Sequence, residues 1–201
     1  MRSAFVSCAV FLAALPPATA RAQDNYEIQV YGASVVPARR TMVELHSNFT
    51  AEGRTGVVDS LLPTEHAFHE TLERRAFSTD TWTWEIRPIV DQQLGRWYWA
   101  INPALEKAVV GENAARGWEF SPNAALSYDL SRAVTAALEY YGAFGPLSGF
   151  DPAPEQQHQL FAAVDLNVSP LWEINLGVGR GFTAATDHLL LKTILGYRLP
   201  F

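Results

Sequence analysis

Apolar and polar side chains alternate along most of the chain after residue 80, and this period of two constrains the fold more than any other feature. A helix would repeat its apolar positions every 3.6 residues, whereas a half-buried strand repeats them every second residue. The alternation therefore predicts an all-β chain of long antiparallel strands. The alternating segments are Trp82–Arg87, Trp97–Asn102, Trp118–Ser127, Val134–Tyr141, Gln159–Val168 and Trp172–Gly179.

The connections between these segments alternate between short and long. Tight turns are expected at Leu94–Arg96, Leu130–Arg132 and Val168–Pro170. Longer connections rich in Gly, Pro, Asn and Asp are expected at Val110–Arg116, Gly142–Gln157 and Gly179–Asp187. Short turns on one side and long loops on the other are typical of outer-membrane barrels. Strands of ten or more residues also exceed the common soluble length of about 5–6 residues.

A soluble β-sandwich or lipocalin-like barrel would also alternate, and composition alone would allow helices at Ala104–Ala115 and Ser131–Gly142. The last strand favours a membrane barrel over these soluble alternatives. Its residues Tyr197, Leu199 and Phe201 share one face, and a terminal Phe with Tyr four residues earlier resembles the recognition signal of bacterial outer-membrane barrels. We therefore predict an antiparallel transmembrane β-barrel of about ten strands (range ~9–12), recognised by the barrel-assembly machinery through Tyr197, Leu199 and Phe201.

Residues 1–22 have the pattern of a secretory signal peptide. Arg2 precedes the apolar run Ala9–Leu15, two prolines follow, and small residues surround Arg21. The barrel domain is then expected to comprise residues 23–201, exported to the cell outer membrane. The single cysteine, Cys8, lies inside the signal segment, so the remaining chain has no disulfide or thiolate chemistry.

Composition excludes several classes of protein. The net charge is −6 and lysine occurs only at Lys107 and Lys192, which argues against nucleic-acid binding. An aromatic content of 12% argues against disorder. After residue 22 no apolar run approaches the ~18 residues of a spanning helix.

Several stretches resemble one bacterial family, the outer-membrane β-barrels often labelled transporters, which are distantly like phenol-degradation meta-pathway channel proteins. The resemblance covers most of residues 27–201 and implies a β-barrel fold and an outer-membrane location. Transport is only the name given to this family and is not implied by the resemblance. No catalytic motif accompanies it. The stretches are Thr41–Thr50, Leu62–Ala67, Asp80–Pro88, Gly149–Pro152 and Ala185–His188.

The chain departs from this family after Glu73, where Arg74–Thr79 takes the place of about three strands. This suggests a truncated member whose barrel closes poorly and whose upstream segment is less well paired than the repeats downstream. The alternative is an even barrel of ten strands. Upstream strand candidates are Tyr26–Gly32, Thr41–Thr50 and Thr64–Glu73.

No residues combine into a convincing catalytic or metal site. His66 and His69 would point to opposite faces of a strand, so one metal ion cannot take both. A small-barrel hydrolase would need Ser, His and an orienting group together, and only the neighbours His46 and Ser47 suggest one. We therefore expect no enzyme activity, cofactor or metal.

Polar residues opposite the apolar face are the best functional candidates. Charges facing lipid cost about 2–4 kcal/mol for Arg or Lys near the midplane, so these residues should face the lumen. They predict a narrow pore or binder for a small solute. The alternatives are a filled structural barrel without transport, a secreted soluble β-protein or, third, an enzyme. The lumen-facing candidates are Glu85, Arg87, Asn102, Glu119, Asn123, Glu139, Asp165, Asn167, Glu173, Asn175, Lys192 and Arg198.

Overall fold

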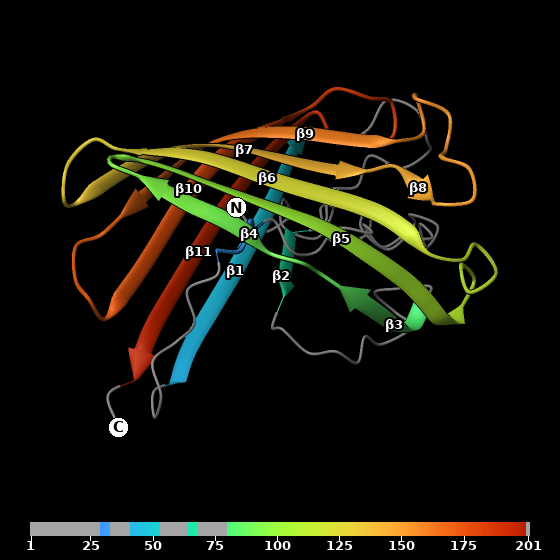
Figure 1. Cartoon of the computed structure of the whole chain (residues 1–201), viewed down its shortest axis with the longest axis horizontal. Coiled ribbons are helices and arrows are strands. Elements are labelled where there is room, and N and C mark those ends of the chain that lie inside the picture. Colours follow the sequence, from blue (N-terminus) through green and yellow to red (C-terminus); the bar gives the residue numbers. More distant parts are fainter. Residues whose placement is uncertain (1–28, 33–40, 53–63, 68–79, 200–201) are drawn as a thin grey trace, which may run out of the picture.

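The computed structural model describes residues 29–32, 41–52, 64–67 and 80–199, and within them all the regular structure is β-sheet. Eleven strands form one antiparallel sheet (Figure 1), so the all-β antiparallel prediction is confirmed and the count lies in the expected range. The signal segment 1–22, the junction 74–79 and Phe201 lie outside the described residues. The strands are β1 (Thr41–Glu52), β2 (Thr64–Ala67), β3 (Asp80–Ile86), β4 (Val90–Leu94), β5 (Trp97–Gly111), β6 (Glu119–Asp129), β7 (Val134–Ala143), β8 (Gly145–Pro146), β9 (Gln157–Leu166), β10 (Trp172–Gly181) and β11 (Leu189–Leu199).

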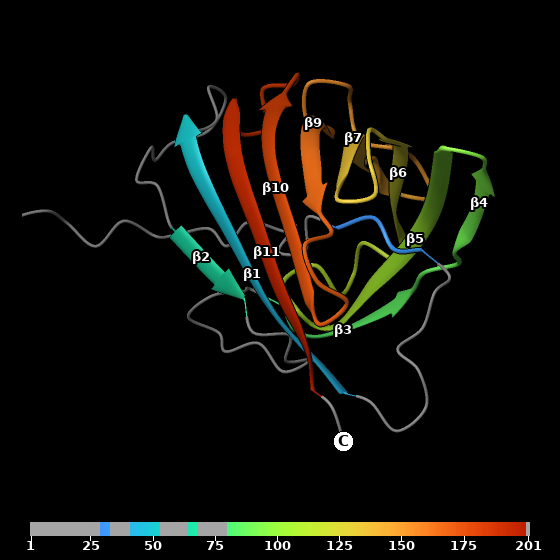
Figure 2. The ribbon, with the colours of Figure 1, turned by 90° about the vertical axis from the view of Figure 1, so that its left-hand side faces the viewer.

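The strands follow the order β2-β1-β11-β10-β9-β7-β6-β5-β3, with β4 also beside β5 and β8 beside β6. β3 and β4 pair with successive parts of β5, so they act as one interrupted strand. β8 likewise continues β7 along β6 beyond Phe144. Within the described residues no pairing joins β2 to β3, and the sheet is an open curl (Figure 2).

The predicted short connections are confirmed, and each has a local cause. Gly95 adopts a φ of 63° between β4 and β5, which is a left-handed conformation that glycine adopts without strain. The Ser131 and Ser169 hydroxyls accept backbone N–H bonds inside the next two short turns. Because neighbouring strands are antiparallel, these three turns lie at one end of the curl and the long loops lie at the other (Figure 1).

The segments for which helices were considered are strands, since β5 and β7 cover them. The prediction of weaker upstream pairing is wrong for β1, which pairs with β11 from Thr41↔Leu199 to Glu52↔Leu189. β2 has a shorter ladder of four pairs. The strand expected at Tyr26–Gly32 is also wrong over its described part, because residues 29–32 lie in no strand.

Burial follows the alternation, but in the opposite sense to a soluble protein. Large apolar side chains on the outer face are exposed, including Trp84 at 56%, Val178 at 52% and Leu138 at 48%. The opposite face buries polar side chains such as Asn102 and Lys192. Soluble proteins rarely bury Lys and expose few contiguous large apolar side chains. The sheet is therefore apolar outside and polar inside its curl.

Candidate functional site: the polar inner face

Glycines on β10 make room for large side chains on the inner face. A Cβ added at Gly177 would overlap the stem of Lys192, and one at Gly179 would overlap the Phe161 ring. Lys192 and Phe161 belong to β11 and β9, the two strands beside β10. The alternating glycines therefore let side chains from both neighbouring strands lie flat over β10.

A buried ion pair crosses the inner face. The Lys192 ammonium donates to Glu139 and lies 3.3 Å from the Tyr141 hydroxyl, which itself donates to Glu139 at 2.7 Å. The Lys192 and Glu139 side chains are only 1% and 7% exposed. Glu139 lies on β7 and Lys192 on β11, with β9 and β10 between them. The contact therefore crosses the inside of the curl and ties two distant parts of the sheet together.

Asp165 and Asn175 extend this polar network along neighbouring strands. The Asn175 amide donates to Asp165 at 2.7 Å, and the two residues face each other in the β9–β10 register. Asn175 is 6% exposed, and its buried Oδ1 has no hydrogen-bond partner among the described residues. An unpaired buried acceptor costs about 1–3 kcal/mol, so this oxygen is available to a donor brought by a ligand or water.

A row of polar side chains crosses the sheet at one level. Asn102 faces Asn123 across β5–β6, Asn123 faces Tyr141 across β6–β7, and Tyr141 faces Gln159 across β7–β9. All four are at most 3% exposed. Within the part of the chain that the structure describes, Asn123 Oδ1 and Gln159 Oε1 have no hydrogen-bond partner. The row is able to bind a group that donates hydrogen bonds.

Asn102 already binds a peptide group. Its Oδ1 accepts the backbone N–H of Tyr31 at 2.6 Å, and its Nδ2 donates to the carbonyl of the same residue at 2.9 Å. Figure 2 shows the short segment 29–32, in blue, running inside the curl towards β5. The inner face is thus in contact with the chain's own upstream segment.

Three further predicted residues belong to ion pairs near the sheet margins. Arg87 binds Glu85 at 2.7 Å, and Arg116 binds Glu119. Glu85, Glu106 and Glu119 also stand in register across β3, β5 and β6. The arginines therefore offset carboxylates that would otherwise repel one another.

Two of the predicted lumen-facing residues form an ion pair at the short-turn end, and a third lies in a short turn there. Arg198 binds Glu173 at 3.2 Å, with both side chains about one-third exposed. Asn167 is exposed in the short connection between β9 and β10. Tyr197 of the expected assembly signal lies against Trp172, with tilted rings and 4.9 Å between ring centroids, and Leu199 ends β11.

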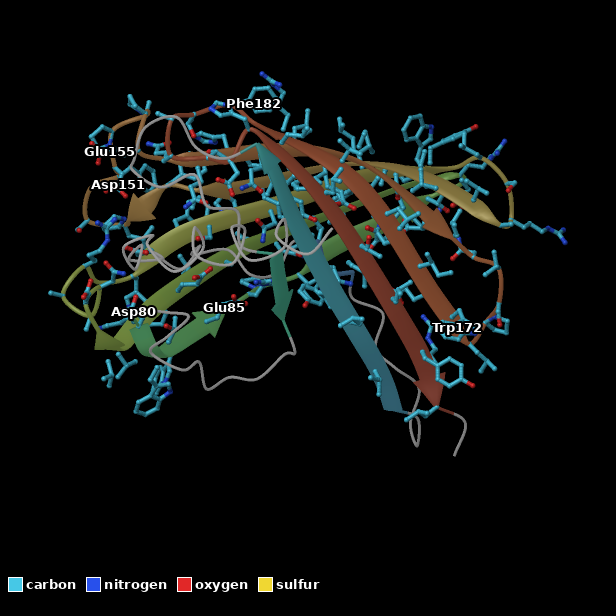
Figure 3. All side chains as sticks on the ribbon, turned by 180° about the vertical axis from the view of Figure 1, so that it is seen from behind. Asp80, Glu85, Asp151, Glu155, Trp172 and Phe182 are labelled. Carbon is cyan, nitrogen blue, oxygen red and sulfur yellow. The ribbon has the colours of Figure 1, made fainter. Side chains whose placement is uncertain are left out.

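The long-loop end holds a separate cluster of polar and aromatic side chains. Arg116 bridges Glu119 and Asp151, and its hydrogen bond to Glu119 raises the pKa of the guanidinium. The Phe144 ring lies edge-on to His158, with centroids 5.1 Å apart. Figure 3 shows Asp151 and Glu155 at this end and Trp172 at the opposite end. The contacts hold the β8–β9 loop against the rim of the sheet.

The candidate set omitted Tyr141 and Gln159, although the alternation had already assigned both to the polar face. A rule that selected every polar or tyrosine side chain on that face would have included them. Among the described residues, no group of three or more His, Cys, Asp or Glu side chains is placed to hold a metal ion. No helix in this part of the chain is long and apolar enough to cross a bilayer.

No protein-family model matches the chain, and no curated protein matches it in sequence. One similar solved chain is described as "De novo design of transmembrane beta-barrels". It is 9% identical and has a TM-score of 0.35, with 82% of this chain and 98% of the designed chain covered. The resemblance to outer-membrane proteins labelled transporters therefore stays a prediction.

Proposed function

We propose that this chain is an outer-membrane β-barrel that binds a small polar solute or gives it narrow passage. The inverted burial carries the proposal: exposed Trp, Leu, Ile and Val side chains cover the outer face, and buried Asn, Gln, Glu and Lys side chains cover the inner face. Contact with lipid stabilises an apolar outer face, and a water-accessible or hydrogen-bonded interior stabilises a polar inner face. A soluble sandwich would place its apolar face inside.

Aromatic residues at both ends of the strands support a membrane position. At the short-turn end, Trp97 lies 4.7 Å from Tyr128 between ring centroids, and Trp172 lies 4.9 Å from Tyr197. Trp82 and the neighbouring Trp84 are exposed towards the long-loop end. Outer-membrane barrels have aromatic girdles at both interfaces and short turns on the periplasmic side.

This orientation would put the chain termini and the short turns in the periplasm and the 142–157 loop outside the cell. Export would depend on residues 1–22, and assembly on Tyr197, Leu199 and Phe201. Deleting Phe201 should reduce the outer-membrane fraction of the protein in cells. Unchanged assembly would contradict the role of the C-terminal signal.

The membrane proposal is tested by placing a charge on the outer face. Leu138→Arg, near the middle of β7, should destabilise the protein in lipid vesicles by about 2–4 kcal/mol. The control Ala133→Arg is exposed in a short turn and should change stability by less than about 0.5 kcal/mol. Urea unfolding followed by tryptophan fluorescence measures both. Equal small effects would show that Leu138 faces water.

A structural barrel without transport is the second candidate, and the buried Lys192–Glu139–Tyr141 network favours it. Barrels near eight strands are filled by side chains, whereas 16–18 strands leave an aqueous channel. Planar-bilayer conductance of the refolded chain separates the candidates. Steps of defined conductance support passage, and a silent bilayer containing folded protein supports a filled barrel.

A further inference from the structure

We propose that Gln29–Gly32 is a tethered plug, bound in a peptide-recognition site on the inner face of the sheet. This inference rests on the proposed function, because a plug can control the passage of a solute only if the solute passes through the interior of the barrel. The site recognises an extended peptide through four different contacts. Each contact comes from a described residue of the curl.

The first contact is apolar. Val30 packs against the buried cluster of Tyr141, Phe161 and Leu190, which come from β7, β9 and β11. Tyr141 and Phe161 meet edge-on with 5.5 Å between centroids, so they present a fixed aromatic surface. This surface provides a subsite for a β-branched or similar aliphatic side chain.

The second contact is a pair of hydrogen bonds to the peptide backbone. The Asn102 carboxamide pairs with both the N–H and the carbonyl of Tyr31, as a neighbouring strand would. Asn102 is 0% exposed, so its amide would be unsatisfied if the segment left and nothing replaced it. A buried side chain with this geometry selects for an extended peptide unit and accepts any residue type there.

The third and fourth contacts select the neighbouring side chains. The Arg87 guanidinium lies over the Tyr31 ring at 5.0 Å from its centroid, within the range of a cation–π contact. A Cβ at Gly32 would overlap the Tyr98 hydroxyl, which is held by a 2.6 Å hydrogen bond to Asp91. The site therefore favours the order aliphatic, aromatic, glycine.

These contacts bridge opposite walls of the curl over a very short length. Val30 meets β7, β9 and β11, whereas Gly32 meets β4 and β5, which lie towards the other edge of the sheet. Two extended residues span at most about 7 Å. The segment thus lies across the interior at the level of Asn102 and obstructs any path for a solute there.

The position of the plug is tested by cysteine labelling in a Cys8→Ser background of the full chain, refolded in vesicles. Val30→Cys should react with a bulky maleimide about tenfold more slowly than Leu147→Cys, a loop position that is 53% exposed. Adding Asn102→Ala or Gly32→Leu should accelerate labelling at position 30 several-fold, because each removes a recognition contact. Gly149→Leu is the matched control, since no atom lies within 4 Å of a Cβ there.

Conductance of the same variants without the added cysteine separates this inference from the proposed function. Higher conductance of Asn102→Ala and Gly32→Leu, together with faster labelling, supports a plug in a pore. Faster labelling with a silent bilayer supports the bound segment and overturns passage. Equal labelling at positions 30 and 147, or no response to either variant, overturns the plug. A gel-mobility shift on heating verifies that each variant is folded.

Discussion

Replacing Lys192 by Met isolates the energetic contribution of the buried network. Met retains an unbranched stem to cover Gly177 but removes the ammonium that binds Glu139. With Lys192 and Glu139 side chains 1% and 7% exposed, water has little access to the carboxylate left behind. Losing one partner of a buried pair costs about 3–5 kcal/mol. The Tyr141 hydroxyl still donates to Glu139, so we expect a cost near the lower limit.

The double variant Lys192→Met/Glu139→Gln should recover much of this loss, because neither position of the pair then carries a charge and Tyr141 keeps an acceptor. Urea unfolding in vesicles gives the free energy of each variant by linear extrapolation. We expect a coupling energy of about 2 kcal/mol, within the 0.5–3 kcal/mol found for residues of one network. The matched control is the partly exposed pair Arg198–Glu173, with an expected coupling of about 0.2–1 kcal/mol. A loss below about 1 kcal/mol for Lys192→Met would refute burial of the pair.

Three further variants test local features by the same unfolding assay. Gly179→Leu should cost about 1–3 kcal/mol or more by overlap with Phe161, and an unchanged midpoint would refute the close packing. Gly95→Val should cost about 1–2 kcal/mol because φ is 63°, and a neutral result would mean that the turn relaxes. Asp80→Ala removes the acceptor of two bonds from Asn113, at 3.0 and 2.8 Å. It should cost about 0.5–3 kcal/mol and make the 112–118 loop easier to cleave with protease, whereas unchanged cleavage would contradict this anchoring.

The strand pattern was predictable because it is local. The alternation assigned Trp97 and Ile101 to one face and Asn102 to the other, and the structure retains that division. The short turns were also predictable, since Gly95 supplies the required backbone conformation. The strand prediction fails for residues 29–32, the described part of 26–32, because Tyr31 there binds Asn102 of the inner face and not a sheet edge.

The sequence by itself determined which side chains share a face, since steric preferences of the extended backbone turn successive residues to opposite sides. Only the tertiary structure decided which inner-face groups meet. Glu139 and Lys192 are 53 residues apart and lie on non-neighbouring strands, so their contact depends on the curvature and stagger of the whole sheet. The contact between Tyr31 and Asn102, 71 residues apart, has the same origin. The alternation within one strand sets the face to which each side chain points. The distance between two side chains on non-neighbouring strands depends on how all the strands are arranged.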